Sequence, residues 1–354
     1  MANGRSRLLQ HLTAAAASLI NMCYGTFMGW PGTTLPILEA EDSPLPLTAD
    51  EGSWLASINS LTMLVAIFAT GYAVDVVGRK KVLLFGAVPL FIWWVMVAFA
   101  NSYGMLLAAR AIGSLGGGPI ITALPVFLCE IADTDVRGTL IVIHYFLMQC
   151  GYLLVYSIGP YLSVTTVALI CASIPIIFFL TFIWMPESPY YFLKQRREAE
   201  AVKCLERFKG QLSREELKFE LESMYQAIRE KQQSKGKLKD VILVPVHRRT
   251  LLLAILASIG LALVLSLVMG ELFHVSVKGV ASAVGITVMA LYGFFLQKMF
   301  QVVSDGLGAY YSFWGFTVMC VGAVVYVYAL MPETRNKTFA QINEEMIHNE
   351  VCPV

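Results

Sequence analysis

The sequence Gly71-Tyr-Ala-Val-Asp75-Val-Val-Gly78-Arg79-Lys80-Lys81 links two uncharged runs, Ser53–Val74 and Val82–Ala100. Each run has about twenty residues, the length that an α-helix needs to cross the hydrocarbon core of a bilayer. An ionised side chain inside hydrocarbon costs several kcal/mol, so the charges between the runs mark a turn at a membrane surface. The chain is therefore expected to cross a membrane on either side of this turn.

Individual residues of the turn suggest how its two helices are held. Gly71 would let two helices approach closely, and Asp75 lies where it can face the positive N-terminus of another helix. Gly78 permits the tight turn that brings Arg79 back. A basic membrane anchor needs neither the aspartate nor the glycines, so we interpret the turn as a charged latch between helices.

The composition of the whole chain is that of a membrane protein. Of its 354 residues, 57% are hydrophobic and 14% are charged, against about a quarter charged in soluble domains. A net charge of +1 provides no basic excess for nucleic acid. The seven cysteines show no C-x-x-C spacing, and the membrane-facing sequence has no His/Asp/Glu cluster or Ser/His pair. We therefore expect no enzyme activity, no metal or other cofactor and no nucleic-acid partner.

Nine runs are long and apolar enough to be spans, and Arg110 is the only full charge well inside any of them. They are Leu12–Leu38, Ser53–Val74, Val82–Ala100, Tyr103–Cys129, Thr139–Gly159, Leu162–Met185, Leu251–Gly270, Gly279–Gln297 and Leu307–Met331. The first run is too long for a cleaved signal peptide and lacks a small-residue cleavage site, so we expect it to stay as the first span. The fold class predicted is an all-α polytopic membrane protein.

The distribution of basic residues predicts the orientation. Arg5 and Arg7 precede the first run, the segment Glu39–Glu51 holds five acids and no base, and Arg79 begins a basic cluster after the second run. Because Lys and Arg accumulate on the cytoplasmic side, we expect a cytoplasmic N-terminus in a multi-pass protein of the plasma membrane.

About half of the charges, 25 of 51, lie in the segment Glu187–Arg249. Its apolar residues recur every three or four positions with a break at Gly210, which predicts short amphipathic helices on the inner face. A solvated charged linker is the alternative. The predicted domains are residues 1–186, a six-helix half; 187–249, this cytoplasmic insert; 250–332, a second membrane part; and 333–354, a tail of cytoplasmic type.

Further motifs lie at the ends of the spans. Arg110 begins the glycine-rich part of the fourth span, and Glu130 lies seven residues before Arg137-Gly138. Pro-Glu motifs that contain Glu187 and Glu333 follow the sixth and the last runs. Together with the latch, this set resembles the sugar porter family of the major facilitator superfamily. The stretch Leu47-Thr-Ala-Asp-Glu-Gly-Ser-Trp54 is similar in particular to the insect facilitated trehalose and hexose transporters.

The resemblance implies a fold and a set of interacting charges. Family members have twelve spans in two pseudo-symmetric halves that rock about a site at the midplane. The residues expected in a cytoplasmic charge network that closes one state are Asp75, Arg79, Glu130, Arg137, Glu187, Glu271 and Glu333. We predict a complete N-terminal six-helix half and an incomplete C-terminal half, since only three apolar runs follow Arg249 where the family has six.

The first of those three runs, Leu251–Gly270, resembles the start of one family helix joined to the end of another. The family's Q-Q-x-S-G-x-N signature and second latch are missing from this part of the chain. Either the run spans the membrane and the C-terminus lies outside, or it rests at the interface and leaves eight crossings. We favour a spanning run, because twenty residues without charge partition strongly into hydrocarbon.

Sugars bind through hydrogen bonds to their hydroxyl groups and contacts with aromatic faces, which suggests candidates for a substrate path. The candidates are Thr26, Trp30, Asn59, Arg110, Tyr145 and Gln149. In the family the position of Tyr145 holds a glutamine, and Gln149 lies one helical turn later. For each candidate, helix packing or an interfacial position is an alternative role, and Arg110 could instead snorkel to the outer interface.

Two functions follow as expectations. The first is facilitative transport of a small neutral sugar, trehalose or a hexose, by alternating access across the lipid bilayer. Family symporters pair the fourth-span arginine with an acid on the first span, and this chain has no such acid, which favours facilitated diffusion. The alternative is a transport-incompetent truncated isoform or gene-model fragment that associates with full-length porters.

Overall fold

A computed structural model describes residues 4–43, 45–133, 135–210 and 212–233, together with residues 291, 294–295, 318 and 321–322. The chain divides into two compact units, Met1–Tyr225 and Gln226–Val354. The first unit contains almost all of the described residues. Of the predicted spans, the last three lie outside the described residues apart from a few positions.

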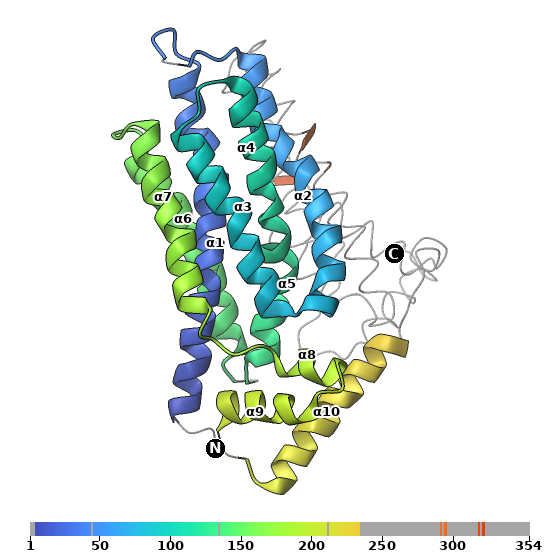
Figure 1. Cartoon of the computed structure of the whole chain (residues 1–354). Helices are drawn as coiled ribbons and strands as arrows, with labels where there is room; N and C mark the ends of the chain where they lie inside the picture. The colour runs from blue at the N-terminus through green and yellow to red at the C-terminus, as the bar shows by residue number, and fades with distance from the viewer. Residues whose placement is uncertain are drawn as a thin grey trace. The chain divides into compact units, whose positions relative to one another are not determined.

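The first unit is a bundle of long helices (Figure 1). In chain order they are α1 (Gly4–Leu38), α2 (Ala49–Val77), α3 (Arg79–Ala98), α4 (Tyr103–Leu115), α5 (Gly117–Ile131), α6 (Arg137–Ile158) and α7 (Val164–Phe182). Helices α4 and α5 are two parts of one rod, interrupted at Gly116. A Cβ atom at Gly116 would lie 2.7 Å from the carbonyl oxygen of Gly86, so this residue lets α3 pack closely. The six predicted N-terminal runs all coincide with these helices.

Within the described residues, five helical segments are long and apolar enough to span a membrane: α2, α3, the α4–α5 rod, α6 and α7. Helix α1 is longer but less apolar, because it carries many polar side chains that are buried inside the bundle. These include Gln10, Thr13, Ser18, Asn21, Thr26, Thr33 and Thr34. A helix surrounded by other helices needs less apolar surface than one that faces lipid. That the first run crosses the membrane remains a prediction.

Helix α1 packs most closely on α6 through glycines. A Cβ atom at Gly25 would overlap the carbonyl oxygen of Met148, and one at Gly151 would overlap the carbonyl oxygen of Met22. Small residues allow helix backbones to approach in this way in membranes, where van der Waals packing replaces the hydrophobic effect. On its other side α1 contacts α3, where Phe27 and Trp30 meet the edge of Trp93 at centroid distances of 5.2 and 5.1 Å.

The predicted insert is helical as far as the structure describes it, so the solvated-linker alternative is wrong for this part. It contains α8 (Pro189–Lys194), α9 (Glu198–Lys209) and α10 (Arg214–Gln233). Helix α9 buries Ala201, Leu205 and Phe208 and ends at Gly210, whose φ of 86° is left-handed. Helices α8 and α9 lie across the end of the bundle where α1 begins (Figure 1).

Helix α9 is tied to the bundle by a buried glutamine on α1. Gln10 Nε2 donates to the backbone oxygen of Phe208 and to Asp133 Oδ2, both at 2.9 Å, and its Oε1 accepts from the Asp133 amide at 3.1 Å. Lys209 Nζ lies 3.5 Å from Asp133 and 2.6 Å from Glu220. One side chain therefore joins α1, the α5–α6 loop and the insert.

Candidate functional site

The latch forms at the turn between α2 and α3. Gly78 has a φ of 103°, which an L side chain rarely adopts, so the predicted tight turn is present. The turn places Arg79 inside the bundle, with only 4% of its side chain exposed. Arg79 Nη2 donates to Glu130 Oε1 at 3.0 Å, and its Nη1 donates to the Val74 carbonyl at 3.3 Å. An ion pair therefore connects the start of α3 to the end of α5.

Glu187 is the carboxylate at the N-terminus of α3. Its two oxygens accept the Lys80 backbone N–H at 3.0 and 3.1 Å, and one accepts the Ser188 N–H at 2.9 Å. A carboxylate is stabilised there by unpaired amides and the helix dipole. Burial nevertheless dominates and raises the pKa of Glu187 above its ordinary value. The Ser188 hydroxyl donates to Glu130, so the segment between α7 and α8 joins the same cluster.

Two contacts expected of the latch stay predictions. Among the described residues, the Asp75 carboxylate is 44% exposed, pairs with Lys194 of α8 at 2.6 Å and lies 3.9 Å from Arg79. The described carboxylate at the N-terminus of α3 is that of Glu187. No described atom would lie within 4 Å of a Cβ at Gly71, so the described part of the chain shows no helix packed closely on this residue.

The structure brings four of the predicted network residues together: Asp75, Arg79, Glu130 and Glu187. Arg137 begins α6 and makes no ion pair with a described residue. Glu271 and Glu333 lie outside the described residues. Ser188 and Lys194 were not among the predicted members. Ser188 lies in the Pro-Glu-Ser-Pro motif directly after Glu187, and this position could have identified it from the sequence.

Arg110 lies deep in the bundle and not at the outer interface, so the snorkelling alternative is wrong. It is 2% exposed. Its Nη1 donates to the Phe27 carbonyl at 2.6 Å and its Nε to the Leu55 carbonyl at 3.2 Å. The guanidinium carbon is 4.0 Å from the centroid of the Phe27 ring and 5.4 Å from that of Trp93. Carbonyl oxygens and ring faces surround the cation, and no described carboxylate pairs with it.

Tyr145 and Gln149 lie together on one exposed face of α6. The Tyr145 side chain is 40% exposed. Two further tyrosines, Tyr152 and Tyr156, continue this face at spacings of three and four residues, and their rings stack at 6.4 Å. Sequence reasoning missed both tyrosines, although the spacing was readable in the chain. The four residues are called the α6 polar stripe.

The other substrate-path candidates are not on this stripe. Thr26 is fully buried, and its hydroxyl donates to the Cys23 carbonyl of its own helix at 2.6 Å. Trp30 is 1% exposed and packs against Trp93. Asn59 is buried on α2, where its amide nitrogen lies 3.8 Å from the Met28 sulfur and its Oδ1 has no partner among the described residues. The first two side chains pack the bundle interior.

A protein-family model described as "Sugar (and other) transporter" matches residues 12–263 and 249–346. The chain belongs to the sugar transporter family. Together with the helical bundle and its apolar spans, this match makes the protein an all-α polytopic membrane protein with the major facilitator fold. The matched relatives are transporters and not enzymes.

Individual sugar transporter relatives are similar to part of this chain. The facilitated trehalose transporter Tret1 of Polypedilum vanderplanki is 32% identical over 202 residues, which cover 57% of this chain and 40% of the relative. Tret1 of Culex quinquefasciatus is 29% identical over 71% of this chain and 48% of the relative. Human solute carrier family 2, facilitated glucose transporter member 6, is 30% identical over 56% and 39%. The chain thus matches less than half of these relatives' length.

Solved structures agree on the fold. The inward open conformation of the xylose transporter XylE from E. coli matches with a TM-score of 0.69 at 17% identity, covering 95% of this chain and 98% of that chain. The human organic anion transporter MFSD10 matches with a TM-score of 0.53 at 15% identity, covering 92% and 100%.

Proposed function

We propose that this chain transports a small neutral sugar, trehalose or a hexose, down its gradient by alternating access. In this proposal the protein lies in the plasma membrane, and the end of the bundle that carries the latch faces the cytoplasm. The basic residues at that end favour this orientation. Membership of the sugar transporter family supports the substrate class. The trehalose and glucose relatives support the particular sugars.

The environment of Arg110 is the observation that carries facilitated diffusion. Proton coupling needs an acid that gains and loses charge inside the membrane. The Arg110 cation is stabilised by the carbonyls of Phe27 and Leu55 and by aromatic faces, and α1 contains neither Asp nor Glu. In the described bundle no carboxylate pairs with the arginine, which supports transport that is not coupled to a proton at this position.

The α6 polar stripe is the part of the path that we assign to the sugar. Gln149 offers an amide that both donates and accepts, and the flanking tyrosines offer ring faces and hydroxyl groups. These are the two kinds of contact that a polyol needs. Its exposed position on a packed helix makes the stripe accessible without disturbing the core.

The latch is the element that we assign to gating. At one end of the bundle, α3, α5 and the segment between α7 and α8 are held together by hydrogen bonds and an ion pair of Arg79, Glu130, Glu187 and Ser188. Separating these helices would break the buried ion pair. The cluster therefore favours the state in which this end is closed.

The test is uptake of radiolabelled trehalose and glucose by oocytes that express the full chain, with surface biotinylation to measure delivery. We expect saturable uptake that an inward proton gradient does not stimulate. Gln149→Leu should raise KM for the sugar, whereas the matched exposed neighbour variant Phe146→Leu should not. Stimulation by the proton gradient would refute facilitated diffusion.

A second candidate is a transport-incompetent isoform that associates with a full-length porter. The presence of three apolar runs after Arg249, where the family has six, favours it. Normal surface delivery without uptake, together with a change in the uptake of a co-expressed full-length relative, would support this candidate over the first.

A further inference from the structure

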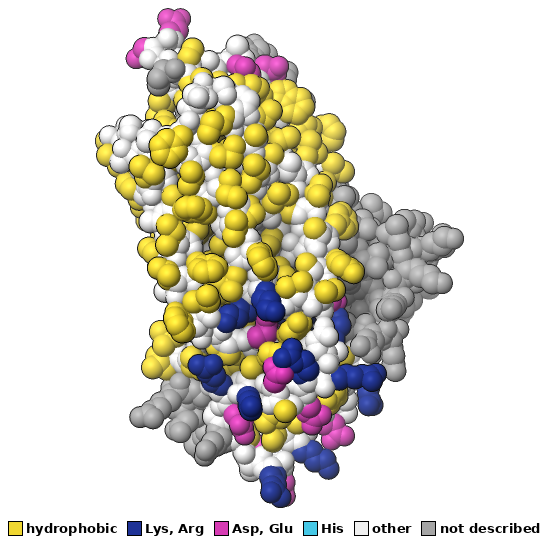
Figure 2. All heavy atoms as spheres, in the orientation of Figure 1, with side chains coloured by type: hydrophobic (Ala, Val, Ile, Leu, Met, Phe, Trp, Pro, Cys, Tyr) yellow, Lys and Arg dark blue, Asp and Glu magenta, His cyan; other side chains and the backbone are white. Residues whose placement is uncertain are grey.

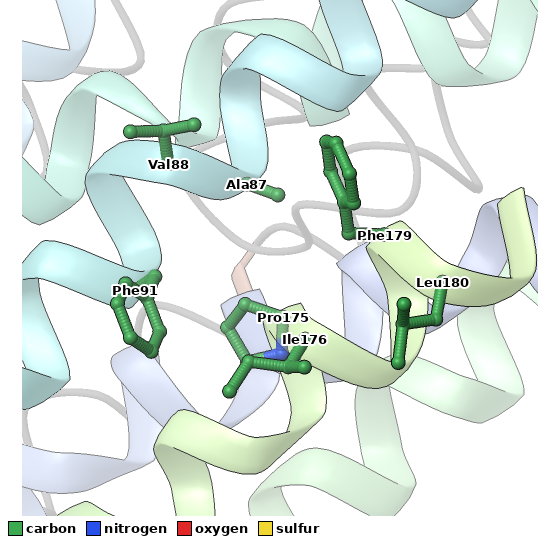
Figure 3. Close-up of a pocket in the computed structure, with 7 residues that line it drawn as sticks. All are labelled: Ala87, Val88, Phe91, Pro175, Ile176, Phe179 and Leu180. Carbon is green, nitrogen blue, oxygen red and sulfur yellow. The ribbon is translucent and has the colours of Figure 1, made fainter. Parts of the chain in front are cut away.

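The outer surface of the bundle has an apolar groove between α3 and α7. Its volume is about 210 Å³, and its walls include Val88 and Phe91 of α3 and Pro175, Ile176 and Phe179 of α7 (Figure 3). Both helices belong to the first unit, and Val88, Phe91, Ile176 and Phe179 are each more than a third exposed. All of the residues that line the groove are apolar, so water gains no hydrogen bonds by filling it.

The groove lies where the bundle faces hydrocarbon. A broad band of hydrophobic side chains covers this face, and charged side chains gather at one end of it (Figure 2). Helices α3 and α7 both qualify as membrane spans. The molecules that meet the groove are therefore the acyl chains of the bilayer.

Basic groups stand at the charged end of the groove. Lys81, Phe85, Val88 and Ile92 are exposed and follow one another at spacings of four, three and four, which places them on one face of α3. Lys81 makes no ion pair with a described residue. Lys80 Nζ donates to the Ile183 carbonyl at 2.7 Å and so joins α3 to α7 at this end. Trp184, 77% exposed, lies two residues after the end of α7, where an aromatic side chain suits the membrane interface.

The distance between the lysine and the groove suits a single lipid molecule. Seven residues separate Lys81 from Val88, which corresponds to about 10 Å along the helix axis. That depth is about a third of a hydrocarbon core of roughly 30 Å, well within the reach of one acyl chain. A lysine can extend its ammonium group toward the headgroup layer from such a position.

We propose that the groove between α3 and α7 is a binding site for an anionic phospholipid of the adjacent leaflet, with one acyl chain in the groove and its phosphate paired with Lys81. Anionic lipids are concentrated in the cytoplasmic leaflet, which is the leaflet at this end in the orientation proposed above. A neutral phospholipid would fill the groove equally well but carries no net charge to attract Lys81. The site therefore selects by charge at the headgroup and by shape along the chain.

The test compares lipid retention by the full chain in phosphatidylcholine nanodiscs with and without phosphatidylserine. After extraction into detergent, native mass spectrometry counts the phosphatidylserine molecules that stay bound. Two variants alter the proposed site: Lys81→Gln removes the cation, and Ile176→Trp fills the groove. Two matched controls leave it intact: Lys218→Gln on the exposed surface of α10, and Ile170→Trp at another exposed isoleucine of α7.

We expect one retained phosphatidylserine in the wild type and in both controls. Lys81→Gln should weaken retention about five-fold, because a basic residue near an anionic surface contributes roughly 1 kcal/mol. Ile176→Trp should abolish it. Equal retention of phosphatidylcholine and phosphatidylserine, retention unchanged by both site variants, or cross-linking of two copies through the groove would each overturn the proposal. Thermal melting confirms that each variant is folded, and loss of retention only in unfolded protein would also count against it.

Discussion

At the scale of single residues, glycines determine how closely α1 and α6 pack. A Cβ atom at Gly151 would overlap a backbone carbonyl oxygen on α1, and backbone atoms cannot move aside as the end of a side chain can. We expect Gly151→Ala to destabilise the protein by about 1–3 kcal/mol, the usual cost of overpacking. Thermal unfolding in detergent measures the change.

Gly138→Ala on the same helix is the matched control, because no described atom would lie within 4 Å of the added methyl group. This variant should be neutral or slightly more stable, since alanine has the higher helix propensity. Equal destabilisation by both variants would show that the close α1–α6 contact is not the reason for glycine at position 151.

Glu187 makes stability depend on pH in a defined direction. Burial raises its pKa above the ordinary value of 4.5, so the folded protein holds this proton more tightly than the unfolded chain does. The contribution of Glu187 to the free energy of unfolding is fully present below pH 4.5. It is lost as the pH rises through the pKa of Glu187 in the folded protein. As the pH rises from 4.5 to the raised pKa of the folded protein, the wild type should lose stability relative to Glu187→Gln, whose side chain does not titrate.

Unfolding midpoints of the wild type and Glu187→Gln across this window measure the difference. Glu222→Gln, on the exposed surface of α10, serves as the control and should keep the wild-type slope. If Glu187→Gln keeps that slope too, the buried carboxylate is not the group responsible.

At the scale of elements, the insert depends on one glutamine for its docking. Gln10 satisfies the Asp133 amide and the Phe208 carbonyl from within the bundle. Gln10→Ala leaves both without their partner, and a buried unsatisfied polar group costs about 1–3 kcal/mol. We expect α9 to separate from α1 more often, with faster amide exchange in α9 and faster proteolysis near Gly210.

Gln195→Ala is the matched control, since Gln195 is exposed and its hydrogen bond to the Asp75 carbonyl is long, at 3.4 Å. Exchange in α9 should be unchanged in this variant. Faster exchange throughout the bundle in Gln10→Ala would instead mean that the glutamine supports the whole fold and not the docking of the insert.

The helices were predictable from the sequence because the membrane imposes one rule on every span. Uncharged runs of twenty residues located α2, α3, α6 and α7, and the period of the insert located α9. The same rule says little about which side chain meets which. Asp75 and Glu187 are both carboxylates near helix ends, and only the packing of α8 and α7 decides that Asp75 meets Lys194 while Glu187 meets the α3 amides.

At the scale of the whole molecule, the buried ion pair between Arg79 and Glu130 joins the start of α3 to the end of α5, 51 residues apart in the chain. Arg79 has one strong partner, Glu130 at 3.0 Å, and a weak one, Asp75 at 3.9 Å. Removing one partner of a buried pair leaves an uncompensated charge and costs about 3–5 kcal/mol, whereas an exposed pair contributes about 1 kcal/mol or less. Glu130→Gln should therefore destabilise the bundle by about 3 kcal/mol, and Asp75→Asn by less than about 1 kcal/mol.

Chemical unfolding of the two purified variants measures this difference, and uptake by the same variants relates it to transport. If the pair closes the latch end of the bundle, Glu130→Gln shifts the protein toward the state open at that end and lowers sugar uptake at equal surface expression. Asp75→Asn retains the buried pair and should keep most of the uptake. Equal losses of stability in the two variants would mean that Arg79 relies on both carboxylates, and that its burial against Glu130 does not set the strength of the latch.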